Sequence, residues 1–95
     1  MRILPVNNNQ KQNQSFEGRI KVEKVREDAA QFVKSYVAET IRRASDELDA
    51  IRTNDKEGNT IIEFDPSVVE NAKKVHERMK NMFANFSLDI TTLEE

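Results

Sequence analysis

The chain has 95 residues, of which 37% are hydrophobic and 34% are charged, with two glycines, two prolines and no cysteine. This length corresponds to one small domain, and the scarcity of turn-forming residues favours long helices. The absence of cysteine excludes disulfides and thiolate metal sites, and a net charge of −2 provides no general attraction to nucleic acid. No segment reaches the roughly 18 apolar residues of a membrane span, so we expect a cytoplasmic protein that is not embedded in a membrane.

Residues 1–14 form a polar segment that is rich in asparagine and glutamine. These residues offer few apolar side chains whose burial would offset the entropy lost on ordering, so we expect a flexible arm. Residues 15–95 are then expected to form a single small helical domain.

The segment 16–23 alternates apolar or glycine residues with charged residues. A period of two is typical of a half-buried strand. Val22 and Val25 also fit helical spacing, which would extend the following helix backwards. Gly18 costs a helix about 1 kcal/mol relative to alanine, so the sequence favours a strand here.

Residues 27–52 are predicted to form a long amphipathic helix. Its apolar residues recur three and four positions apart, which places them on one side of the helix. They are Ala29, Val33, Val37, Ile41, Ala44, Leu48 and Ile51. Phe32 and Tyr36 widen this apolar stripe on one flank. Acidic residues in the first turn and Arg52 in the last would complement the helix dipole.

A polar run at 53–59 predicts a loop, because it contains a glycine and no apolar side chain. The next five residues, 60–64, are mainly β-branched and aromatic and are bounded by turn residues. They predict a second strand.

A second helix is predicted over 66–86. Asp65 can cap the first free amides, and Pro66 suits the first helical position because its missing N–H costs nothing there. Alternatively, Ser67 and Glu70 form a capping box. The apolar residues of this helix are Val68, Val69, Ala72, Val75, Met79, Met82, Phe83 and Phe86.

Together these elements predict a mainly α fold with minor β structure. Its centre would be a long two-helix hairpin, formed by 27–52 and 66–86, with short strands near 16–23 and 60–64. The apolar stripe of the first helix is wider than one neighbouring helix covers. We therefore expect a homo-oligomer or a stable complex with a protein partner.

No pattern in the sequence indicates an enzyme. His76 is the only histidine and no second ligand stands at metal-binding spacing, so packing at the core boundary explains it better than catalysis or metal binding. The acidic residues around Asp55 and Glu57 do not complete a calcium-binding loop. Two glycines are too few for a phosphate or dinucleotide cradle. We expect no catalytic residue, no metal, no cofactor and no small-molecule substrate.

Two groups of residues are candidates for binding a macromolecule. The first is an apolar partner interface, because methionine-rich surfaces adapt to partners, although the heptad-like spacing is also typical of a plain core. Its residues are Phe32, Tyr36, Met79, Met82, Phe83 and Phe86. The second is a basic surface on the second helix that would contact phosphates. Its residues are Lys73, Lys74, Arg78 and Lys80.

The sequence thus favours a small non-enzymatic interaction or assembly subunit that acts through amphipathic helix faces. Its partner would be another protein or further copies of itself. The alternative is a nucleic-acid-associated accessory protein that uses the basic face of the second helix. A sequence pI near 5.5 makes this alternative the weaker one.

Overall fold

The computed structural model describes residues 18–94. The predicted arm over 1–14 and the first two residues of the predicted strand 16–23 lie outside the described residues. The elements, in chain order, are β1 (Gly18–Val22), α1 (Gln31–Glu47), β2 (Ile51–Asn54), β3 (Thr60–Phe64), the 3₁₀ helix η1 (Pro66–Val68), α2 (Val69–Ala84) and β4 (Thr91–Glu94).

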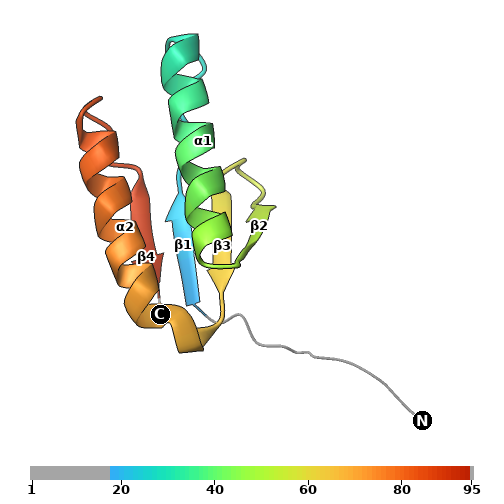
Figure 1. Cartoon of the computed structure of the whole chain (residues 1–95). Coiled ribbons are helices and arrows are strands. Elements are labelled where there is room, and N and C mark those ends of the chain that lie inside the picture. The colour runs from blue at the N-terminus through green and yellow to red at the C-terminus, as the bar shows by residue number, and fades with distance from the viewer. Residues whose placement is uncertain (1–17, 95) are drawn as a thin grey trace.

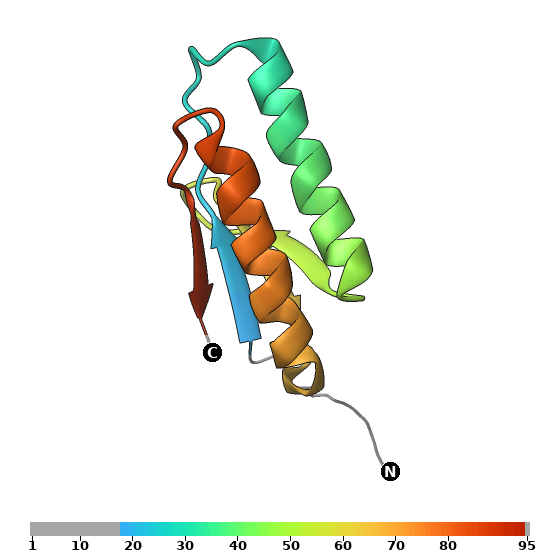
Figure 2. The same cartoon turned by 60° about the vertical axis from the view of Figure 1, so that its left-hand side comes forward.

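The four strands form one antiparallel sheet in the order β2-β3-β1-β4. Strands β1 and β3 are therefore central, and β2 and β4 are the edges. Both helices cover the same face of this sheet and run in opposite directions (Figures 1 and 2). The order of elements along the chain and of strands in the sheet is the ferredoxin-like, split βαβ arrangement.

This architecture is α+β, so the predicted mainly α hairpin is wrong. The two helices are not consecutive, because β2 and β3 lie between them in the chain. The predicted helix over 27–52 extends too far at both ends, and its last residues belong to the edge strand β2. The predicted helix over 66–86 is divided into η1 and α2. Strand β4 has no counterpart among the predicted elements.

Helix α1 ends in a Schellman motif. The amide of Ala50 donates to the carbonyl of Ser45 over 2.9 Å, and the amide of Asp49 donates to the carbonyl of Asp46 over 3.2 Å. Asp49 has a φ of 51°, the left-handed conformation that glycine usually supplies at this position. Because no glycine marks the end of the helix, the apolar spacing continues to Ile51 and predicts too long a helix.

Helix α2 ends in the same way. The amide of Leu88 donates to the carbonyl of Phe83 over 3.1 Å, and the amide of Ser87 donates to the carbonyl of Ala84 over 2.9 Å. Ser87 is again a non-glycine residue with a left-handed φ, 59°. This turn reverses the chain and leads it into β4 beside β1.

The core lies between the two helices and one face of the sheet. All its members come from the apolar faces that periodicity indicates, and they are Ile20, Val22, Val37, Ile41, Ala44, Leu48, Ile62, Phe64, Ala72, Val75, Met79 and Phe83.

Gly18 of β1 lies opposite Phe64 of β3, at one end of the ladder between the two central strands. A Cβ atom added to Gly18 would lie only 2.2 Å from Cε2 of the Phe64 ring. The ring is fully buried and therefore has no free space into which to move. The ring thus occupies the space that a side chain at position 18 would need.

Substitution of Gly18 by alanine is expected to lower the free energy of unfolding by about 1–3 kcal/mol, because the new methyl group overpacks a buried site. Urea denaturation followed by circular dichroism measures this loss. In a Phe64→Leu background the same substitution should cost clearly less, since the blocking ring is gone. Equal costs in both backgrounds would contradict the packing described for this pair.

At the end of α1, the variant Asp49→Gly is expected to be about 1 kcal/mol more stable than Asp49→Ala. Both variants remove the carboxylate, but only glycine adopts the left-handed φ without a Cβ clash. Denaturation of the two proteins in parallel isolates the backbone effect. Indistinguishable stabilities would show that φ at position 49 carries no cost.

Candidate functional site

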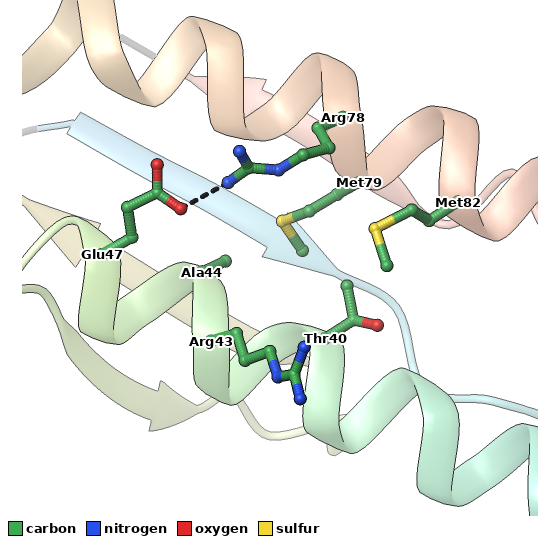
Figure 3. Close-up of a pocket in the computed structure, with 7 residues that line it drawn as sticks. All are labelled: Thr40, Arg43, Ala44, Glu47, Arg78, Met79 and Met82. Atoms are coloured by element: carbon green, nitrogen blue, oxygen red, sulfur yellow. Dashed lines mark hydrogen bonds and ion pairs between the residues drawn. The ribbon is translucent and has the colours of Figure 1, made fainter.

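A groove of about 290 Å³ runs between α1 and α2, with strand β1 behind it (Figure 3). Both helices contribute to its walls because they lie side by side on the sheet. The lining residues are Thr40, Arg43, Ala44 and Glu47 from α1, and Arg78, Met79 and Met82 from α2.

The floor of this groove is mainly apolar. Met79 and Ala44 are buried, and Met82 is half-buried. Figure 3 shows the thioether side chains of Met79 and Met82 directed from α2 toward α1. Methionine side chains are flexible and polarisable, so such a floor can adjust to the shape of an inserted group.

An ion pair crosses the groove at one end. The guanidinium of Arg78 on α2 donates to the carboxylate of Glu47 on α1, and both side chains are about half exposed (Figure 3). An exposed pair of this kind contributes little to folding stability. The pair connects the two helices across this end of the groove.

A second set of charges lies on the α1 side of the rim. Glu39 accepts hydrogen bonds from Nη2 of Arg42 over 2.5 Å and from Nε of Arg43 over 2.9 Å. The bonds from Arg42, and next those from Arg43, lower the pKa of Glu39 from 4.5 to about 2. The charged residues that line the groove are thus Arg43, Arg78 and Glu47, and Glu39 and Arg42 extend this network along α1.

Three aromatic rings gather beyond the other end of the groove, and we call them the aromatic corner: Phe32, Tyr36 and Phe86. The centroid of the Phe86 ring lies 4.9 Å from that of Tyr36 and 6.0 Å from that of Phe32, both in edge-on geometry. Phe32 remains 67% exposed. The reason is that the first turn of α1 extends past the end of α2 (Figures 1 and 2).

The aromatic corner and the groove form one continuous surface. Tyr36 lies one helical turn before Thr40 on α1, and Phe86 lies four residues after Met82. The antiparallel course of the helices brings these two ends together. The surface is therefore apolar from the aromatic corner to the methionines and charged at its rim.

Six residues form the partner interface that the sequence predicts. The structure gathers three of them in the aromatic corner and places Met79 and Met82 in the groove. Phe83 has no exposed surface and belongs to the core. The sequence reasoning misses the α1 wall of the groove. Continuing the Phe32 and Tyr36 flank by steps of three and four would have indicated Thr40, Arg43 and Glu47.

The four basic residues predicted to contact nucleic acid do not share one side of α2. Lys73 and Lys80, seven residues apart, lie on one side, whereas Lys74 and Arg78, four residues apart, lie on another. Arg78 is engaged by Glu47, and Lys73 donates to Glu70 over 3.4 Å. The positive charges of these residues therefore point in two directions from α2. Nucleic-acid binding through them stays a prediction.

In some four-stranded sheets, nucleic acid binds to the face that no helix covers, where its bases stack on aromatic side chains. By cross-strand register, this face carries Arg19, Lys21, Ile51, Thr53, Ile61, Glu63, Thr92 and Glu94. Within the described strands none of these residues is aromatic. Nε of Arg19 lies 3.9 Å from the carboxylate of Glu63, which partly neutralises the centre of the face.

In the acidic loop between β2 and β3, the carboxylate of Asp55 forms hydrogen bonds within the loop itself. Asp55 accepts hydrogen bonds from the amides of Glu57 and Asn59, and from the side-chain amide of Asn59, over 2.9–3.0 Å. The side-chain bond from Asn59 is the main cause of the lowered pKa of Asp55. In turn, Asn59 accepts from the amide of Lys24 over 2.9 Å, so this loop is tied to the segment after β1.

His76 lies at the margin of the core. Its Nε2 atom is shielded from solvent and has no hydrogen-bond partner among residues 18–94. In the same range, no three histidine, cysteine, aspartate or glutamate side chains are grouped so that they could hold a metal ion.

Neither of the two described α-helices has the length and apolar composition needed to span a bilayer. The cytoplasmic location stays a prediction. Comparison of the chain with protein-family models, curated proteins and solved structures gave no significant match. Function must therefore be inferred from the groove, its rim and the aromatic corner.

The charge network of the rim predicts a specific titration. Because the pKa of Glu39 is lowered in the folded protein, its ionic contribution to stability is present above pH 4.5 and is lost as the pH falls through about 2. Carboxyl titration by NMR should find the low pKa, and Arg42→Ala should raise it toward 4.5.

The matched control for this titration is Arg26→Ala, which removes an exposed pair with Asp28 away from the groove. This variant should leave the pKa of Glu39 unchanged. If Arg42→Ala also leaves that pKa unchanged, the hydrogen bonds from Arg42 are not its cause.

Proposed function

We propose that this protein is a non-enzymatic assembly subunit that associates with a second copy of itself through the groove and the aromatic corner. The exposure of Phe32 is the observation that carries this proposal. Its ring is held against Phe86 on a regular helix, so it stands on the surface in a defined position. Burial of apolar surface stabilises a complex by about 25 cal/mol per Å². The exposed ring of Phe32 lacks this stabilisation in the free chain and would gain it in an interface.

The charges of the rim favour a second copy over a strongly charged partner. A two-fold interface uses the same patch twice, so the patch must be complementary to itself. The groove is lined by two arginines, Arg43 and Arg78, and one carboxylate, Glu47, and the carboxylate of Glu39 is hydrogen-bonded to Arg43. A polyanion would meet these carboxylates, whereas a second copy can place each charge near one of the opposite sign.

The apolar parts are also suited to each other. In such a pair, Phe32 of each copy would lie against the methionine floor of the other groove. Contact between a thioether and an aromatic ring is favourable, and the flexible side chain of Met82 can adapt to the ring. The buried part of the interface would then be apolar and its rim ionic, as in stable protein interfaces.

Size-exclusion chromatography with light scattering at micromolar concentration tests this proposal. The wild-type chain should be a dimer, and Phe32→Asp should be a monomer whose circular dichroism spectrum is unchanged, because Phe32 is mostly exposed. Ile51→Asp is the matched control, since Ile51 is the other large hydrophobic residue that is exposed within residues 18–94.

Ile51 lies on β2, away from the groove, and the Ile51→Asp variant should remain a dimer. A monomeric wild-type protein would overturn the proposal. So would a dimer that Phe32→Asp leaves intact.

A further inference from the structure

Strand β2 is an edge strand that is exposed along its whole length. It pairs with β3 on one side only, and each residue of Ile51–Asn54 is exposed. The outer side of such a strand presents amide and carbonyl groups with which another extended chain can pair. The strand contains no proline or lysine, and Arg52 is its only charged residue.

A hollow of about 360 Å³ lies between this strand and α1. Its lining residues are Ala38, Ile41, Arg52, Thr53, Asn54 and Thr60. A second hollow of about 330 Å³ shares Ala38, Ile41 and Thr60 with the first and continues it along α1. Neither hollow shares a lining residue with the groove, so both are separate from it.

Arg52 is the one charged residue that the structure places in the lining of the first hollow. It lies on the helix-covered side of the sheet, because its cross-strand neighbour Ile62 is in the core. No described carboxylate forms an ion pair with it. Ile51, the preceding residue, lies on the opposite face of the sheet and exposes 47% of its surface.

We propose that β2 accepts an extended peptide segment as a fifth strand, with a carboxylate side chain of that segment paired to Arg52. Successive side chains of a strand point to opposite faces. An acidic residue facing Arg52 is therefore flanked by neighbours that face Ile51, where apolar side chains fit. Main-chain pairing supplies the affinity, and the alternating pockets supply the specificity.

The edges of a second copy do not provide this carboxylate. On the helix-covered side, β2 carries Arg52 and Asn54, and β4 carries Thr91 and Leu93. Neither edge brings an acidic side chain to that face. The charge of the hollow therefore selects a foreign acidic strand, which makes this site distinct from the self-association proposed for the groove.

Titration of the isotope-labelled full chain with short peptides, followed by NMR, tests this proposal. The probe is the acetylated and amidated pentapeptide threonine–valine–glutamate–valine–threonine. It should produce saturable shifts in the amides of β2 and of Ala38 and Ile41. Replacing its glutamate by glutamine should weaken binding about two- to fivefold, the range expected for an exposed ion pair.

A charge swap separates recognition from a merely structural effect. Arg52 is exposed, so Arg52→Glu should fold normally and should prefer the lysine version of the peptide to the glutamate version. Phe32→Asp should bind the original peptide as the wild-type chain does, which keeps this test independent of the dimer.

Several outcomes would overturn the strand site. One is the absence of saturable shifts, and another is a set of shifts confined to the α1–α2 groove. Equal binding of a peptide whose three central amides are N-methylated would exclude main-chain pairing. If a thymidine decanucleotide shifts the same amides at lower concentration than the peptide does, the site is one for nucleic acid.

Discussion

The structure depends on the close contact between Gly18 and the ring of Phe64, at one end of the ladder between the two central strands. This contact lets a large aromatic side chain fill the core directly above β1. Cross-strand partners point to the same face, so it also fixes the direction of the neighbouring residues. Ile20 and Ile62 follow on the helix-covered side, and Arg19 is placed on the uncovered side. The helices can cover only the apolar face, and both therefore lie on it.

Much of this arrangement could be predicted from the periodicity of the sequence. The rest could not be predicted, for identifiable physical reasons. Strand β3 coincides with the predicted segment because its β-branched residues are bounded by turns. The edge strands give no such signal. All four residues of β2 are exposed, so no apolar alternation is present, and Ile51 fits the spacing of the preceding helix. The left-handed residues Asp49 and Ser87, which end the helices, are not glycines. Strand β2 forms through its hairpin with β3, and β4 forms through pairing with β1, which is distant in the sequence.

The candidate site could likewise be predicted from the sequence only in part. Helical spacing alone identifies Phe32 and Tyr36 as a flank outside the main stripe. Their contact with Phe86 requires that α1 and α2 run in opposite directions and that α1 extend past the end of α2. The second condition depends on where each helix begins and ends on the sheet, which helical spacing does not reveal. Phe32 lies in the first turn of α1, which extends past the end of α2, and it stays largely exposed.

The strand order also explains why the two flanks of α1 differ. Two helices on a four-stranded sheet leave an edge uncovered, and β2 lies beside α1 at that edge (Figure 1). On the α2 side, residues of both charges lie beside the methionines, which is the basis for proposing a second copy as the partner. On the β2 side, Arg52 is the only charged residue that lines the first hollow, which is the basis for proposing an acidic strand. A single helix therefore separates two surfaces that differ in charge and in the partner proposed for each.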